Sequence, residues 1–212
     1  MQRNLLITGH HPCEKVIGSI LPWLGTVIHK CHNSGISKEF LSTKEIDHIC
    51  FRCSSNEEYI DIKSRMTSEH IGTLLVEGII GGRPISTVLL SKPYIYENWS
   101  IPCIEITSPK AGKVHQTGLE HIEVVIGNDE DSFLDSKEKL LKFTEQYPQI
   151  EFDLKAIDKE VNADVSFTLE GIGSIKFHVK SLRDVCNYEL SGGLVEKVSP
   201  DYFLNSNLDA PH

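Results

Sequence analysis

Four polar residues with metal-binding side chains recur at one interval along the chain. His48 and His121 each follow an acidic residue and precede an isoleucine, and they lie 73 positions apart (121 − 48). Glu105 and His178 each lie among apolar residues and are also 73 positions apart (178 − 105). A fixed interval is typical of a duplicated structural unit, and imidazole and carboxylate groups are common ligands of transition metals. The spacing therefore predicts one metal site that two similar halves of the chain build together.

The alternation of side chains along a strand predicts how these residues meet. Residues two apart in a strand face the same side, so the face that carries His48 also carries Cys50 and Arg52. By the same rule, the face that carries His121 also carries Glu123. If the two halves pack with pseudo-twofold symmetry, these faces converge with those of the other two candidate ligands on one cavity.

The donor set indicates the kind of metal and the kind of site. Three imidazoles and one carboxylate suit a divalent metal ion such as Zn, Ni, Fe or Mn. Four protein ligands in an octahedral shell leave two positions for water or a bidentate substrate, which is typical of a catalytic site. A single histidine in a strand is more often a hydrogen-bonded structural residue, but Glu105 would be costly to bury without a partner. The recurrence of all four residues favours the metal.

Three further residues are candidates for roles beside the metal. Glu123 could act as the catalytic general base, as a hydrogen-bond partner of a ligand, or as the ion-pair partner of Arg52 or Lys176. Arg52 and Arg83 are candidate substrate-binding residues, because a guanidinium group binds a carboxylate through two parallel hydrogen bonds. A solvated turn position is an equal alternative for Arg83, which follows two glycines.

Two acidic residues directly precede the candidate histidines. Strict alternation places Asp47 and Glu120 on the face opposite to His48 and His121. We therefore expect both carboxylates at the surface or in contact with a helix, outside the metal site.

Hydrophobic periodicity predicts an α+β fold of two units, each with the order strand, helix, strand, strand, strand. The first unit is predicted to contain a strand at 46–53, a helix from 55 to 72, and strands at 73–80, 84–90 and 101–107. The second is predicted to contain a strand at 120–126, a helix at 132–147, and strands at 150–157, 164–169 and 174–180. We expect these two βαβββ units to share one sheet, because each alone would leave one face of its sheet open.

The predicted boundaries divide the chain into three parts. They are an N-terminal helical extension (1–45), a single domain (46–190) with module one (46–118) and module two (119–190), and a C-terminal tail (191–212). Within the extension, Pro22 interrupts an apolar helical pattern, which predicts two helical pieces or a kink. After Cys186 no clear periodicity remains, and we predict little structure there.

Composition excludes some classes of partner. The formal net charge of the 212 residues is −9, and nucleic-acid binding depends on Lys and Arg, so we do not expect a nucleic acid as the main partner. No stretch approaches the roughly 20 apolar residues that cross a bilayer, and the apolar run near the N-terminus is too short for a secretory signal. We therefore expect a cytoplasmic protein without a membrane partner.

The cysteines are predicted to be free thiols. Six cysteines lie scattered along the chain, and such a pattern without a secretory signal is seldom a disulfide framework. Cys50 and Cys53 are separated by two residues, but on a strand their side chains face opposite sides, which argues against a shared metal or redox site.

Several motifs together give a resemblance to a known family. They are Asp47-His48-Ile49 with Arg52-Cys53, Gly82-Arg83-Pro84-Ile85, Gly118-Leu119-Glu120-His121-Ile122-Glu123, and Ile175-Lys176-Phe177-His178. Over about residues 35–186 the chain resembles the bacterial YecM family. That family is similar in fold to the vicinal oxygen chelate superfamily, which includes glyoxalase I and extradiol dioxygenases.

The resemblance implies a fold and a set of ligands. It implies paired βαβββ modules that form a cup-shaped mixed sheet, with a divalent metal held by strand residues of both modules. Carried over by position, the implied ligands are His48, Glu105, His121 and His178. The last-strand ligand of the superfamily is usually a glutamate, so the histidine at position 178 is a departure from the pattern.

Three functions are compatible with these observations. The first is a metal-dependent enzyme that acts on a small oxygen-rich substrate chelated by the metal, through isomerase, lyase or oxygenase chemistry. The alternative is a small-molecule binding or sequestering protein that uses the same cup without turnover. A third is a structural metal that ties the two halves together. An exposed edge strand could also support a homodimer.

Overall fold

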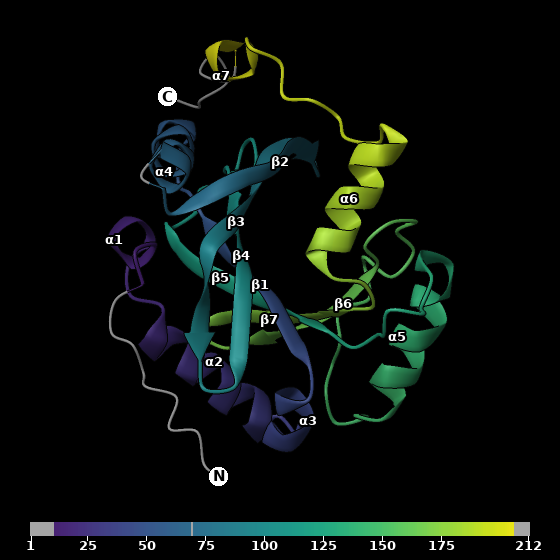
Figure 1. The fold of residues 1–212 in the computed structure, drawn as a ribbon. Helices are drawn as coiled ribbons and strands as arrows, with labels where there is room; N and C mark the ends of the chain where they lie inside the picture. Colours follow the sequence, from purple (N-terminus) through teal and green to yellow (C-terminus); the bar gives the residue numbers. More distant parts are fainter. Residues whose placement is uncertain (1–10, 69, 206–212) are drawn as a thin grey trace.

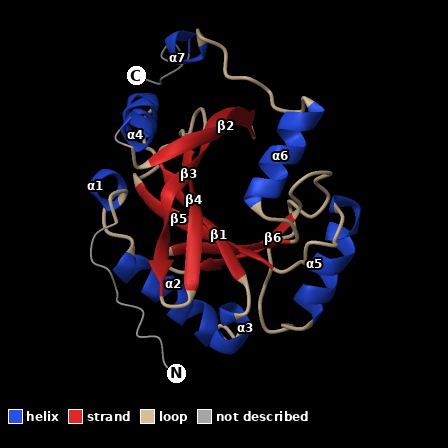
Figure 2. Ribbon diagram, in the orientation of Figure 1, coloured by secondary structure: helices blue, strands red, loops and turns tan. Residues whose placement is uncertain are grey.

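Seven strands form one mixed sheet in the computed structural model of the chain, which describes residues 11–68 and 70–205. The strand order across the sheet is β2-β3-β4-β1-β5-β7-β6 (Figures 1 and 2). The strands are β1 (Glu45–Arg52), β2 (Gly72–Ile80), β3 (Arg83–Tyr96), β4 (Trp99–Thr107), β5 (Gly118–Val125), β6 (Asp164–Leu169) and β7 (Gly173–His178). Isoleucine, valine and other β-branched residues recur in them, as strand propensity requires.

Two similar halves meet at the centre of this sheet. In one half β1 lies parallel to β4, and in the other β5 lies parallel to β7. The two halves join through the antiparallel neighbours β1 and β5. A pseudo-twofold axis at this seam relates the halves, and the predicted α+β fold built on paired modules is confirmed.

The helices lie around the sheet and connect its strands. They are α1 (Glu14–Ile17), α2 (Leu21–Asn33), α3 (Lys38–Ser42), α4 (Asn56–Ser68), the short 3₁₀ helix η1 (Phe133–Asp135), α5 (Ser136–Glu145), α6 (Leu182–Gly192) and α7 (Tyr202–Asn205). The predicted break in the N-terminal helical pattern is confirmed, because Pro22 lies in the first turn of α2, where a missing N–H costs nothing.

One face of the sheet packs on helices and forms the main core. Its strand residues alternate with those of the other face, as Ile49 and Phe51 on β1 and Ile104 and Ile106 on β4 illustrate. The helices α2, α4 and α5 supply the opposing layer, and the figures show them around the outside of the sheet (Figure 1). Because this face of the sheet is covered by helices, the opposite face, which carries the candidate metal ligands, is left to line a cavity.

The other face of the sheet lies against α6. Leu182 and Cys186 of this helix pack with Cys103 of β4 in a small separate apolar cluster. The prediction of little structure after Cys186 is therefore wrong for residues up to 192. Ser181 caps the helix by accepting a hydrogen bond from the N–H of Asp184 at 3.2 Å, and Gly193 ends it in the left-handed conformation.

The strand predicted at 150–157 is also wrong. Only Asp153 pairs there, through an isolated bridge to Ser166 of β6. The Asp153 carboxylate accepts a hydrogen bond from the N–H of Lys155 at 2.9 Å, so the chain turns instead of continuing along β6. Module two therefore has one strand fewer than module one, while the elements that carry the candidate ligands are present in both.

No helix within the described part of the chain is both long enough and apolar enough to cross a bilayer.

Candidate metal centre

Two β-bulges lie at the seam between β1 and β5. On β1, the register shifts between Ile46 and His48 and leaves Asp47 without a cross-strand partner. On β5, a shift leaves Glu120, the residue before His121, without one. The bulges are related by the pseudo-twofold axis, and each turns an acidic side chain away from the direction that strict alternation gives it.

Asp47 is a buried partner of the candidate ligand beside it, so the prediction of a surface position is wrong. Its side chain is 2% exposed, and one carboxylate oxygen accepts a hydrogen bond from Nδ1 of His48 at 2.8 Å. The other oxygen accepts a hydrogen bond from the N–H of Leu182 in the first turn of α6, so the predicted helix contact is confirmed. These bonds hold the pKa of Asp47 low: burial would raise it, but His178 and His48 outweigh burial.

His48 presents its second ring nitrogen to the interior. Because Nδ1 donates to Asp47, the ring orientation is fixed and Nε2 is left for another partner. Nε2 is buried, has no hydrogen-bond partner, and lies 3.6 Å from Oε1 of Glu123. Burial alone would lower the pKa of His48, but Glu123 and Asp47 outweigh it and raise the pKa well above the usual value. The carboxylates around His48 thus favour a positive charge at Nε2, which is a proton in the metal-free chain and which a bound metal ion would replace.

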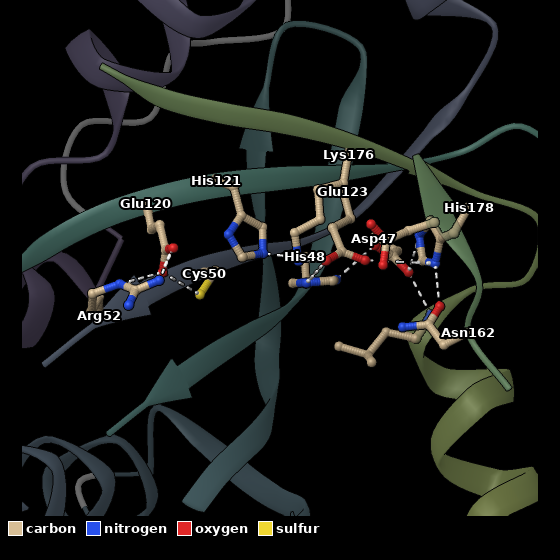
Figure 3. Close-up of polar contacts among 12 residues, drawn as sticks. Asp47, His48, Cys50, Arg52, Glu120, His121, Glu123, Asn162, Lys176 and His178 are labelled. Atoms are coloured by element: carbon tan, nitrogen blue, oxygen red, sulfur yellow. Dashed lines mark hydrogen bonds and ion pairs between the residues drawn. The ribbon is translucent and has the colours of Figure 1, made fainter. Parts of the chain in front are cut away.

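His121 faces His48 across the seam. The two ring centroids are 6.0 Å apart (Figure 3). Both ring nitrogens of His121 are buried and make no hydrogen bond of good geometry, although Nε2 lies 3.2 Å from a carboxylate oxygen of Glu123. Burial, together with the ammonium group of Lys176, lowers the pKa of His121 to about 4. A neutral imidazole with free nitrogens is the form that binds a metal.

Glu105 completes a group that could hold a cation. Ligand atoms of His48, Glu105 and His121 all lie within 4.8 Å of one another. Two imidazoles with unpartnered nitrogens and a half-buried carboxylate therefore meet at one point of the cavity. These three residues fit a divalent metal ion in donor type and in burial, since unsatisfied buried nitrogens are otherwise costly.

A second group shares one member with the first. Ligand atoms of Cys50, Glu120 and His121 also lie within 4.8 Å of one another. Glu120, however, already accepts hydrogen bonds from two nitrogens of Arg52, one of them at 2.7 Å. Burial raises the pKa of Cys50 well above its usual value, which keeps the thiol protonated. The second group is thus the weaker candidate.

Glu123 lies between the two histidines and an ammonium group. Its Oε1 accepts a hydrogen bond from Nζ of Lys176 at 2.7 Å and lies 3.2 Å from Nε2 of His121 (Figure 3). Burial would raise the pKa of Glu123, but Lys176 and His48 outweigh burial and lower it well below the usual value. Of the alternatives considered from sequence, the structure contains the ion pair with Lys176, and it also places the carboxylate beside both candidate ligand histidines, at 3.2 Å from His121 and 3.6 Å from His48.

The register of the strands shows that Glu105 and His178, which the spacing along the chain had matched, do not occupy equivalent positions in the two modules. His48 pairs with Cys103 on β4, and its counterpart His121 pairs with Ser174 on β7. The corresponding interval is thus 71 positions (174 − 103), two fewer than between the histidines. By this register the counterpart of Glu105 is Lys176, so module two carries an ammonium group on the strand position where module one carries a candidate ligand.

His178 lies farther along β7, on the other side of His48. Its ring centroid is 6.3 Å from that of His48, its Nδ1 is 2.9 Å from Oδ1 of Asn162, and its Nε2 is 3.3 Å from Asp47. It is not a member of either candidate group. The structure thus brings together three of the four predicted ligands, and the ligand role of His178 stays a prediction.

The two predicted substrate-binding arginines both line the cavity, but their guanidinium groups have different hydrogen-bond partners. The cavity has a volume of about 460 Å³ and lies beside Glu105, His121, Glu123 and Lys176. Arg52 is engaged by Glu120, whereas Arg83 donates only to the carbonyl oxygen of Ser108, at 3.1 Å. The alternative of a solvated turn residue is wrong for Arg83, which is 8% exposed.

Some residues of the site were not identified from the sequence. Asp47 and Glu120 were assigned to the wrong face because a bulge leaves no clear signature in a single sequence. Lys176 was considered only as a partner of Glu123, and its register position requires the pairing of β5 with β7. The apolar residues of α6 had a signal, because Leu182, Val185 and Cys186 follow helical spacing after the capping residue.

Comparisons with known proteins point to one family. A family model described as YecM protein matches residues 26–189. Protein YecM of Escherichia coli (strain K12) is 30% identical over 150 residues, which cover 68% of this chain and 78% of the relative. A solved structural-genomics structure, Protein EC4020, aligns with a TM-score of 0.58 and 24% identity over 84% of this chain and 93% of that chain.

A dioxygenase is also among the structural neighbours. BphC, a halotolerant catechol dioxygenase, aligns with a TM-score of 0.38 and 8% identity over 64% of this chain and 40% of that chain. At this level of similarity the alignment carries no argument about activity.

Proposed function

This chain belongs to the YecM family, and we propose that it binds a divalent metal ion and acts as a metal-dependent enzyme on a small oxygen-rich molecule. The single observation that carries the proposal is the meeting of His48, Glu105 and His121 within 4.8 Å. The buried, unpartnered nitrogens of both histidines support it, because a cation would satisfy them. We propose these three residues as the ligands, with His178 as an alternative fourth ligand.

Each ligand has a distinct role in this proposal. Asp47 orients His48 and fixes the proton on Nδ1, which keeps Nε2 available for the metal. His121 is kept neutral by burial and by Lys176, and Glu105 contributes a negative charge. A bound divalent metal supplies Lewis acidity, which stabilises negative charge that develops on a substrate oxygen.

The surrounding residues favour one class of chemistry over another. Two histidines and one carboxylate are the donor set of non-haem Fe(II) oxygenases, which leave positions open for substrate and O₂. Isomerase or lyase chemistry needs a free base beside the metal, and the Glu123 carboxylate is already engaged by the ammonium group of Lys176 at 2.7 Å. We therefore favour Fe(II) and oxygenase chemistry, with Zn, Ni or Mn and an isomerase or lyase reaction as the alternative.

Part of the cavity wall is apolar, which supports chemistry in a partly dehydrated site. Leu182, Val185 and Cys186 of α6 line the cavity opposite the polar face of the sheet. Apolar groups at this place exclude water from the ligand and strengthen the electrostatic interactions of the charged residues.

A second candidate function is binding without turnover. Lys176 lies on the strand position equivalent to that of Glu105, and its ammonium group already neutralises Glu123, at 2.7 Å. A cavity whose charges are compensated by its own side chains could hold a small molecule without a metal. This reading predicts a metal-free protein whose stability does not respond to chelators.

We also propose a cytoplasmic location. All six cysteines are buried free thiols, which is typical of proteins in a reducing compartment.

The test is a calorimetric titration of metal-free, untagged protein with Fe(II), Zn(II) and Mn(II) under anaerobic conditions. We expect one site that is lost in both His48→Ala and His121→Ala and kept in His178→Ala. The control is His32→Ala, which removes an exposed histidine of α2 far from these ligands in the fold. No binding by the unmodified chain, or binding that survives both ligand variants, would overturn the proposal and favour the binding protein.

A further inference from the structure

Positive side chains without acidic partners gather beyond the proposed metal ligands. Among the described residues, Arg83, Lys110 and Lys113 take part in no ion pair, as is also true of other exposed lysines such as Lys92 and Lys197. What distinguishes this group is its place, because Arg83 and Lys110 line the cavity and Arg83 is only 8% exposed. The chain carries a net charge of −9, so a buried guanidinium group without a carboxylate partner calls for a physical reason.

Arg83 is the buried member of this cluster. It is the first residue of β3, directly after the Gly81–Gly82 turn, and it lines the cavity. One guanidinium nitrogen donates to the carbonyl oxygen of Ser108 at 3.1 Å, while Nε is buried without a hydrogen-bond partner. An unsatisfied buried N–H of a charged group is costly, so a bound acceptor would stabilise this arrangement.

Two hydroxyl groups beside Arg83 are also unsatisfied. The side-chain oxygens of Thr107 and Ser108 are buried and have no hydrogen-bond partner in the described structure. Thr107 lies in the sheet between Arg52 of β1 and Ile85 of β3, and Ser108 is the residue to which Arg83 donates. Hydroxyl donors next to a guanidinium group are typical components of sites for oxyanions.

Lys110 extends the cluster to the mouth of the cavity. It is exposed, lines the same cavity, and is followed by a turn in which the N–H of Lys113 donates to its carbonyl oxygen at 3.1 Å. Arg83, then partial burial, Lys113 and Arg52 lower the pKa of Lys110. Lys110 thus lies close enough to Arg83 for the two positive charges to repel each other.

Arg52 is less suited to receive an anion than Arg83. Two of its nitrogens are occupied by the carboxylate of Glu120. The acidic side chains of Glu105, Glu120 and Glu123 also lie along the cavity, toward the proposed metal ligands. Asp164 and Glu189 line the cavity as well, and Asp164 is paired with Lys159 at 3.0 Å. Among the described lining residues, Arg83 and Lys110 have no carboxylate partner, and we call their surroundings the cationic part of the cavity.

We propose that Arg83 and Lys110 form a binding site for an anionic group, a carboxylate or a phosphate, at the cationic part of the cavity. The ligand of such a site is a small organic anion. This proposal rests on the proposed function only in that the ligand is placed in the same cavity. The guanidinium group of Arg83 makes the buried contact, and the ammonium group of Lys110 closes over the anion from the loop. Because the anion contacts no metal ligand, its binding does not require a metal.

The test uses inorganic phosphate and succinate as probes, each titrated by calorimetry into the metal-free full-length chain. Arg83→Gln is expected to weaken binding of the preferred anion at least tenfold, or about 1.4 kcal/mol. Lys110→Gln is expected to weaken it about threefold, as an exposed contact does. Lys142→Gln, which removes an equal charge from an exposed pair on α5, is the matched control and is expected to bind as the unmodified chain does.

The two probes distinguish the two sources of the anionic group, because binding of only one of them assigns the site to phosphates or to carboxylates. The proposal is overturned if neither probe binds the unmodified chain, or if both variants bind as tightly as the control. Should Arg83→Gln fail to fold, Lys110→Gln decides, because the exposed side chain does not contribute to the core.

One further variant separates this proposal from that of the metal. His48→Ala is expected to lose metal binding and to keep anion binding. If this variant loses metal binding but still binds the anion, both proposals are supported. If the unmodified chain binds the anion but no metal, the anion site is supported and the metal site is overturned.

Discussion

Module one and module two have the same backbone plan but different charges at equivalent places. Each begins with a strand in which a bulged acidic residue precedes a buried histidine, Asp47 before His48 and Glu120 before His121. On the parallel neighbour strand, module one carries Glu105 and module two carries Lys176. The duplication has thus kept the frame and one ligand type, and has exchanged a carboxylate for an ammonium group.

This difference explains how the acidic groups of the cavity are balanced. A carboxylate at the position of Lys176 would be repelled by Glu105 and Glu123 whenever no metal is bound. The ammonium group of Lys176 instead pairs with Glu123 at 2.7 Å. Since Lys176 compensates the charge of Glu123, a single divalent metal ion is enough to compensate the remaining acidic group of the proposed site.

The two modules also differ in their cores. The counterpart of Phe177 in module two is Ile106 in module one, by the same register. The Phe177 ring lies 4.6 Å from the ring of Phe143, and Phe152 and Phe167 surround it at 6.4 Å and 6.3 Å between centroids. Module two thus compensates for its missing strand with aromatic contacts.

The largest expected effect tests this contrast of the cores. Phe177→Ala should lower the free energy of unfolding by about 3–5 kcal/mol, because it removes a fully buried ring and leaves a cavity among the other rings. Ile106→Ala removes fewer atoms and should cost less, toward the lower end of about 2–5 kcal/mol. Urea denaturation of both variants measures the difference. An equal loss in the two would contradict the special role of the aromatic cluster.

The next effect tests the ammonium group of module two. Lys176→Met removes the ammonium group 2.7 Å from Glu123 and leaves only the neighbouring histidines to compensate the buried carboxylate. It should cost about 3 kcal/mol, near the lower limit for breaking a buried pair. Adding Glu123→Gln removes the stranded charge and should restore part of the stability. A double-mutant cycle in urea measures the coupling, and additive losses would mean that the pair contributes nothing.

A smaller effect tests the bulge of module one. Asp47→Asn keeps the size of the side chain but weakens the hydrogen bond that orients His48. Metal affinity should fall by about 10–100-fold, the usual range for partners of metal-bound histidines. Glu120→Gln, at the equivalent bulge, should have little effect on affinity, because Glu120 contacts Arg52. A similar loss of metal affinity in both variants would mean that Asp47 and Glu120 do not play different roles at the metal site.

A last substitution makes the two modules alike at the position where they differ in charge, and we expect its effect to be small. Lys176→Glu places a carboxylate at the position equivalent to Glu105 and should raise metal affinity about tenfold through one further charged ligand. The same change should destabilise the metal-free chain, because Glu123 then faces a like charge. Competition with a chelator of known affinity measures the gain. Unchanged affinity would mean that the position of Lys176 does not face the metal.

The strands and the central helices could be predicted from sequence because their apolar residues repeat with a clear period. The bounds of β6, for example, agree with the predicted strand at 164–169. The strand at 150–157 could not be excluded, because the turn at Asp153 depends on a side-chain hydrogen bond. The helix α6 was missed although its capping serine and apolar spacing were present in the sequence.

The proposed site was only partly accessible to the same reasoning. Spacing alone identified His48, His121 and Glu105, whose ligand atoms lie together in the structure. It also matched Glu105 with His178, because an interval along the chain carries no information on strand register. Register depends on loop lengths and bulges, and here the two modules differ by two residues between the paired strands.

A crystal structure of the chain after equilibration with Fe(II) or Zn(II), with the metal located by anomalous scattering, would show directly whether these three side chains bind one ion. We predict a single metal ion within about 2.0–2.2 Å of a ring nitrogen of His48, a ring nitrogen of His121 and an oxygen of Glu105. Lys176 should remain paired with Glu123. A metal bound elsewhere, or no anomalous peak among these three side chains at saturating metal, would contradict the account.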